Sequence, residues 1–140
     1  MRLAPIVDRI RANAPALKHV GGGANLAALS SAPSRTPAAF VVPVRESASA
    51  NTSATMDVAQ RITRRFGIII VVRNASDARG EAALDGGLAA ARAEVDAAIV
   101  GWAPEADAGL VTRASGRLLS FAAGALWWQD EYEYETWRSA

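Results

Sequence analysis

The chain contains no cysteine and a single histidine, His19. Without thiols it cannot form a disulfide framework, a thiolate zinc site, an iron–sulfur cluster or a cysteine nucleophile. With one imidazole it cannot build a histidine-rich metal site or a histidine relay within one chain. These two absences remove much of the chemistry used by enzymes and metalloproteins, and we predict no catalytic, metal-binding or cofactor-binding residue.

An excess of charge of one sign is lacking as well. Fifteen basic residues face fourteen acidic ones, which leaves a formal net charge of +1. A chain that binds nucleic acid through its phosphates normally carries a strong positive field. We therefore expect no specific contact with nucleic acid.

Long hydrophobic runs are missing too. The longest, residues 67–72, is far shorter than the roughly 20 apolar residues that a membrane helix needs. Asp8 and Arg9 place charge near the start of the chain before an apolar stretch develops. We expect neither a membrane partner nor a signal peptide.

The 140 residues, 51% of them hydrophobic, are enough for one hydrophobic core, and we predict a single domain over 1–140. Leu3, Ile6 and Ile10 recur at helical spacing and predict a helix over 3–14, which Pro15 ends. Residues 17–20 are expected to add a further helical turn. The three glycines 21–23 then form a flexible turn before a short helix over 24–29.

Residues 38–73 predict a long β-hairpin. Residues 38–44 are rich in β-branched and aromatic side chains, and Pro43 should lie at an edge or a bulge because it has no amide hydrogen to donate. Residues 46–55 are small and polar, as in a mobile loop. Residues 58–66 fit either a strand or a helix, whereas 68–72 predict a strand. We favour one long second strand, whose first half projects beyond the core as an arm.

The clearest helical pattern covers 78–100, where Leu84, Leu88, Val95 and Ile99 share one face. A close approach to the sheet would explain the two glycines at 86–87, and Gly101 should end the helix. Strands are expected within 110–137, at 110–113, 116–121 and 126–137. The order of elements predicts an α+β fold, a mostly antiparallel sheet with a long hairpin and two main helices on one side.

The last strand carries an acidic cluster, made of Asp130, Glu131, Glu133 and Glu135. Carboxylates so close together could serve hydrolysis or bind a hard cation. They could equally form a solvated strand face, because alternate residues of one strand point the same way. A protein interface is the third possibility, since five of the nine aromatic residues lie in the same segment, 127–137.

Charge is segregated along the chain. Residues 126–140 hold four acids and one base, whereas 1–125 hold ten acids and fourteen bases. Arg61, Arg64 and Arg65 lie on the predicted arm. A basic arm and an acidic strand on one chain suggest head-to-tail contacts between copies, in a ring or a filament. Ordinary surface charge is the alternative.

Several segments, taken in order from residue 39 to the end of the chain, resemble the tail terminator (tail completion) proteins of long-tailed phages and prophages. They are 39–44 (AFVVPV), 60–66 (QRITRRF), 68–73 (IIIVVR), 77–80 (DARG), 101–104 (GWAP), 116–119 (GRLL) and 126–133 (LWWQDEYE). The resemblance implies a small α+β domain that assembles as a hexameric ring. Such a ring would sit on the last tail-tube ring, stop polymerisation of the tube and offer a surface to neck proteins of the head.

The resemblance also implies a place in the virion, at the head-proximal end of the tail, after synthesis in the host bacterial cytoplasm. The expected partners are further copies of the chain, the tail tube protein and a neck or head-completion protein. The candidate interface residues are Glu46, Asn51, Thr55, Arg61, Arg64, Arg65, Trp127, Trp128, Glu131, Tyr132, Glu133, Tyr134 and Glu135. Trp127 and Trp128 fit a core position as well as an interface.

Two other functions remain open from the sequence. A head–tail connector would form a ring in the same virion but bind on the portal side. A small enzyme that uses the Asp and Glu cluster belongs to a different class, and we expect no such activity.

Overall fold

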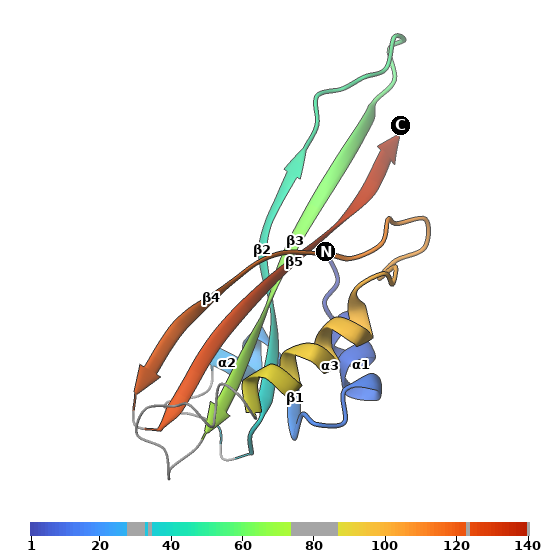
Figure 1. The fold of residues 1–140 in the computed structure, drawn as a ribbon. Coiled ribbons are helices and arrows are strands. Elements are labelled where there is room, and N and C mark those ends of the chain that lie inside the picture. Colours follow the sequence, from blue (N-terminus) through green and yellow to red (C-terminus); the bar gives the residue numbers. More distant parts are fainter. Residues whose placement is uncertain (28–32, 34, 74–86, 123, 140) are drawn as a thin grey trace.

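The computed structural model describes residues 1–27, 33, 35–73, 87–122 and 124–139, which form three helices and a five-stranded sheet (Figure 1). The helices are α1 (Ala4–Asn13), α2 (Gly23–Ala27) and α3 (Ala89–Ile99). The strands are β1 (His19–Gly22), β2 (Ala38–Ala48), β3 (Ala59–Arg73), β4 (Thr112–Ala122) and β5 (Ala125–Ser139). They lie in the order β1-β2-β3-β5-β4, and every neighbouring pair except β1–β2 is antiparallel. The predicted α+β class with a mostly antiparallel sheet is confirmed.

One face of the sheet is covered by α1 and α3, which pack against each other (Figure 1). Ile6 and Ile10 of α1 and Val95 and Ile99 of α3 are fully buried there, in one core cluster with residues of β2, β3 and β5. These residues recur at helical spacing because each helix buries one apolar face against the core, and this spacing is visible in the sequence. The prediction that both main helices lie on one side of the sheet is confirmed.

The opposite face has a smaller apolar cluster, in which Phe40, Ile69 and Val71 are buried and Leu26 of α2 packs against them. The second half of β3 is therefore covered on both faces. This explains the uninterrupted apolar run 67–72, because a strand buried on one face only would alternate apolar and polar residues.

The segment before α2 differs from its prediction. Residues 17–20 were expected as a helical turn and 21–23 as a flexible turn, but His19–Gly22 form strand β1, parallel to β2 and in register from His19–Ala38 to Gly22–Val41. Two glycines in four residues give no strand signal. Hydrogen bonding to β2 and burial of Val20 decide the structure here.

The hairpin has its predicted outer bounds, 38 and 73, but its first strand is longer than predicted. β3 is a single strand over Ala59–Arg73, so the choice left open for 58–66 is resolved as strand. β2 continues to Ala48, four residues beyond the predicted end, because Glu46, Ser47 and Ala48 pair with β3 although their side chains are polar or small. Pro43 lies at a shift of register, in the part of β2 that β1 does not reach.

Strand β4 is a single strand in a segment where two strands were predicted. Residues 110–113 and 116–121 were expected as separate strands, but Thr112–Ala122 is continuous, with register shifts between Arg113 and Ser115 and between Leu118 and Ser120. For the predicted helix 78–100, α3 begins at Ala89, and residues 74–86 lie outside the described part of the chain. The helix ends before Gly101, whose φ of +82° suits glycine.

Gly87 gives a test of how closely the turn before α3 approaches the sheet. A Cβ atom at this position would lie 2.5 Å from Cγ1 of the buried Val72. We expect Gly87→Ala to lower the free energy of unfolding by about 1–3 kcal/mol through overpacking, although alanine favours helices. Urea unfolding followed by circular dichroism measures it.

Gly22→Ala is the matched control for this experiment, because nothing lies within 4 Å of a Cβ at Gly22. Its stability should stay within about 0.5 kcal/mol of the wild type. Equal effects of both substitutions would contradict a specific close contact at Gly87.

Candidate interaction surface

Three strands continue beyond the helices as an arm, formed by residues 43–48 of β2, 59–66 of β3 and 133–139 of β5, and closed by loop 49–58 (Figure 1). The sequence predicted an arm of two strands. β5 joins it because its pairing with β3 runs without interruption to the pair Ala59–Ser139. A third strand stabilises a projection that would be marginal as an isolated hairpin.

Asn51 organises the loop at the end of the arm. Its Oδ1 accepts hydrogen bonds from the backbone amides of Ser53 (3.1 Å) and Ala59 (2.9 Å), and its Nδ2 donates to the carbonyl of Asp57 (3.0 Å). These bonds give a definite shape to a segment that its composition predicted to be mobile. Thr55 is exposed in this loop, beside a fully exposed Met56.

One face of the arm carries ion pairs between β3 and β5. Arg65 lies 3.3 Å from Glu131 and 3.1 Å from Glu133, and all three side chains are at least partly buried. Arg61 and Glu135 lie 3.6 Å apart, with about half of each side chain exposed. The cross-strand register places Arg65 directly opposite Glu133, which explains the closest of these contacts.

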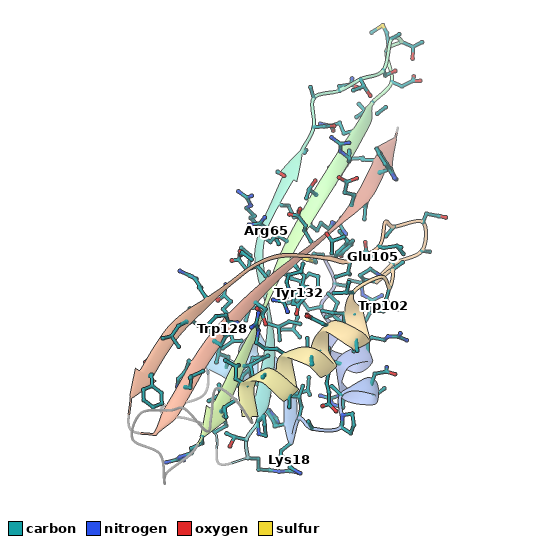
Figure 2. All side chains as sticks on the ribbon, viewed as in Figure 1. Lys18, Arg65, Trp102, Glu105, Trp128 and Tyr132 are labelled. Atoms are coloured by element: carbon teal, nitrogen blue, oxygen red, sulfur yellow. The ribbon has the colours of Figure 1, made fainter. Side chains whose placement is uncertain are left out.

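The other face of the arm, toward the helices, is organised by Arg64. Its Nε lies 2.9 Å from Glu46, and its Nη1 donates to both carboxylate oxygens of Glu105 at 2.9 Å. Glu105 belongs to the loop between α3 and β4 (Figure 2). Arg64 therefore ties β3 to β2 and to that loop.

These pairs change the interpretation of the segregated charges. The arginines of the arm and the glutamates of β5 were expected to match between copies, but they lie opposite each other within one chain. A solvated strand face was one of the alternatives for the acidic cluster, and it does not describe Glu131, whose side chain is 17% exposed. The signal in the sequence for these ion pairs was the alternate spacing of arginines in one strand and glutamates in the other. It could not be used without the register between the two strands, which the sequence does not give.

Tyr132 and Tyr134 are core residues. Both were candidates for an interface, but their exposed fractions are 0% and 1%, and their rings pack against Phe66 with centroids 5.7 and 6.2 Å away. The period-2 alternation of β5 was recognised correctly. Its aromatic side faces the helices instead of a partner, because that is where the apolar core lies.

The adjacent tryptophans point to opposite faces of the sheet and are both partly buried. Trp127 packs against the small cluster around Phe40, whereas Trp128 packs against the main core. The indole Nε1 of Trp128 donates to Asp130 at 2.9 Å, and the Arg92 guanidinium lies 4.7 Å from its ring centroid. Much of the surface of both tryptophans is therefore used within the chain.

A buried polar network, which the sequence did not reveal, connects α3 to β4 and β5. Asp130 is fully buried and accepts hydrogen bonds from Arg92 of α3 at 2.9 and 3.1 Å, and from Arg113 of β4. Arg113 also donates to Asp96 of α3 at 2.6 Å, and the Tyr132 hydroxyl donates to the same carboxylate. Figure 2 shows Trp128 and Tyr132 beside α3 at this junction.

The network sets the protonation of its members. Burial alone would raise the pKa of Asp130, but hydrogen bonds from Arg92, Trp128 and Arg113 outweigh it and lower that pKa below its ordinary value. Burial and the hydrogen bond to Asp96 raise the pKa of the Tyr132 hydroxyl. At neutral pH Asp130 is thus a charged acceptor and Tyr132 a neutral donor.

Trp137 is an interface candidate that the sequence reasoning left out. It is 66% exposed near the end of the arm and borders an open hollow between the arm and the loop after α3. Pro5, Arg64, Pro104, Glu105 and Thr136 also line this hollow. An exposed tryptophan on a rigid strand is a typical anchor for a protein partner.

The described residues contain no group of three or more His, Asp or Glu side chains arranged to hold a metal ion. In the same part of the chain, no helix has the length and apolar character required to cross a membrane.

A charge exchange tests the pairing on the arm. Arg65→Glu or Glu133→Arg alone should each lower the free energy of unfolding by about 1 kcal/mol, because each removes a partly buried pair and sets like charges side by side. The double exchange should recover a large part of the loss in thermal unfolding experiments. Additive losses in the double variant would contradict a direct pair.

Asp130→Asn tests the buried network. It should lower the free energy of unfolding at pH 7 by about 3–5 kcal/mol, because Arg92 and Arg113 lose the charge that compensates them. Since the folded pKa of Asp130 is lowered, its stabilising effect is complete above the unfolded pKa of about 3.9. It is lost as the pH falls from there through the folded value. In urea titrations the difference between wild type and variant should shrink at low pH, and a difference independent of pH would contradict this assignment.

Comparison with known proteins agrees with the resemblance seen in the sequence. A search of curated proteins found no match. A family model described as "Phage tail terminator protein" matches residues 1–139, which is essentially the whole chain. The chain therefore belongs to the phage tail terminator family, whose members have a structural role in the phage tail.

Proposed function

We propose that this protein forms a ring, most simply a hexamer, that caps the head-proximal end of the phage tail tube. The cap stops polymerisation of the tube and presents a surface to a neck or head-completion protein. The chain is made in the host bacterial cytoplasm before it enters the virion. The family match over residues 1–139 carries this proposal.

The geometry of the arm supports a role in contacts between proteins. It extends beyond the body of the subunit, and its shape is held by three paired strands, by Asn51 in the loop and by the contacts of Arg64 and Arg65 (Figure 1). A rigid projection loses little conformational entropy on binding, so more of the contact energy contributes to affinity. A cap acts by occupying a binding surface and needs no catalytic group.

The exposed apolar residues at the end of the arm are suited to supply binding energy. Met56 is fully exposed and Trp137 is 66% exposed. Arg61, Arg64 and Arg65 of the arm are paired with glutamates of the same chain, so they shape the surface more than they attract a partner. We assign the main anchoring contact to Trp137, with loop 49–58 beside it.

Assembly of tubes in vitro tests the function. Tail tube protein from the same phage is polymerised with and without the chain, and tube lengths are measured by negative-stain electron microscopy. We expect the chain to shorten the tubes at molar ratios far below one, because one ring suffices to block each growing end. Tubes of unchanged length, with the chain absent from their ends, would refute the proposal.

Trp137→Ala should raise the concentration needed for half-maximal shortening by about tenfold or more, as expected for removal of an anchor residue. Val100→Ala is the control, because Val100 is 44% exposed but lies at the end of α3, off the arm. Both variants must keep the thermal unfolding midpoint of the wild type to within a few degrees. Equal effects of the two would show that Trp137 is no anchor.

A further inference from the structure

The sheet has an open edge along β4. Within the described part of the chain, β5 is the single strand with which β4 pairs, and Figure 1 shows β4 at the margin of the molecule. Residues 114–120 are all exposed. An edge strand of 11 residues presents unpaired amide and carbonyl groups and can accept another strand.

A second open edge lies on the opposite side of the same sheet. β1 pairs with β2 only as far as Val41, so the rest of β2 has no neighbour on that side among the described residues. Residues 43–48 are exposed as a result. Each subunit thus carries one open edge on β4 and one on the outer half of β2.

The directions of the strands make these two edges compatible. Strands alternate in direction across β2, β3, β5 and β4. A second copy placed edge to edge in the same orientation therefore sets its β2 antiparallel to the first copy's β4. We propose that β4 of one subunit pairs with residues 44–48 of β2 in the next, so that the sheet continues from copy to copy. This inference rests on the proposed ring.

The side chains at the two edges favour this contact. Leu118 and Leu119 of β4 are 52% and 39% exposed, and Val44 of β2 is 38% exposed. These three belong to the small set of large hydrophobic side chains that the described residues leave in water. Pairing of the edges would bury them beside the new backbone hydrogen bonds. Two complementary edges on one chain make a head-to-tail contact, which closes as a ring when the rotation between copies permits.

The two edges are offset along the strands. β4 pairs with residues 125–133 of β5. Residues 42–48 of β2 pair with a part of β3 that in turn pairs with residues 131–136 of β5. The centres differ by four to five residues, or roughly 15 Å at about 3.3 Å per residue. Closed sheets need such a stagger, because it inclines the strands to the axis. The offset is therefore compatible with closure.

Cysteine cross-linking tests the pairing, and the absence of native cysteine makes every cross-link attributable to the introduced residues. Val44→Cys and Leu118→Cys are prepared as separate proteins and then mixed and treated with copper phenanthroline. Within one chain the two positions lie on strands separated by β3 and β5, at least about 14 Å apart from three strand spacings alone, which is too far for a disulfide. We expect a covalent dimer in the mixture and almost none with either protein alone.

Because the register of the new pair is not fixed by one subunit, Ser47→Cys is tested in the same way against Ser115→Cys, Arg117→Cys and Leu118→Cys. Cross-linking of Leu118→Cys with itself but not with Val44→Cys or Ser47→Cys would indicate a symmetric β4–β4 contact and overturn the proposal. Failure of every mixed pair, when light scattering shows that the wild type is oligomeric, would overturn edge pairing while leaving the ring intact.

A second measurement does not depend on register. Leu118→Lys should weaken self-association by about tenfold or more, because a charged lysine on an edge strand opposes pairing. Leu110→Lys is the matched control, with the same change at a residue of similar exposure just before β4. Equal association of the two variants would overturn the proposal.

A wild type that remains monomeric at every concentration and on tube ends would refute the proposed ring itself, and the edge pairing with it.

Discussion

The register between β3 and β5 is the constraint on which the other features depend. It runs from the pair Ala59–Ser139 to the pair Arg73–Ala125 and forms the spine of both the body and the arm. It sets Phe66 opposite Tyr132 in the core and Arg65 opposite Glu133 on the other face. A slip of one residue would turn the tyrosines into water and the glutamates into the core, so burial of one face fixes the register strongly.

The buried charges around Asp130 fasten α3 to this spine. Asp130 belongs to β5, Arg92 and Asp96 to α3, and Arg113 to the edge strand β4. Such a network contributes less to net stability than its number of contacts suggests, because each charge loses its hydration. Its more definite effect is geometric. It fixes the position of α3 and β4 relative to β5, and hence the line of the sheet edge along β4.

Much of the fold could be predicted from local patterns. The apolar stripe of α1, the run 67–72 and the alternation in 126–137 each follow from periodicity, and they gave the α+β class and the helical layer correctly. Strand β1 could not be predicted, because its glycines carry no propensity and its pairing with β2 is a distant contact. The interface candidates were only partly separable from core residues. Tyr132 and Tyr134 have the composition of an interface, but the helices cover them.

By itself, the sequence determined that the chain has no thiol and a single imidazole, and it predicted most of the helices and strands, because residue types and their spacing act locally. It also contained the segments that resemble tail terminators, and the family match confirms that resemblance. Only the tertiary structure decided which charges meet. More than sixty residues of chain separate Arg65 from Glu131 and Glu133, and their pairing within one chain depends on the antiparallel register of β3 and β5. The open edges were likewise decided by the order of strands in the sheet, a long-range property that no local pattern encodes.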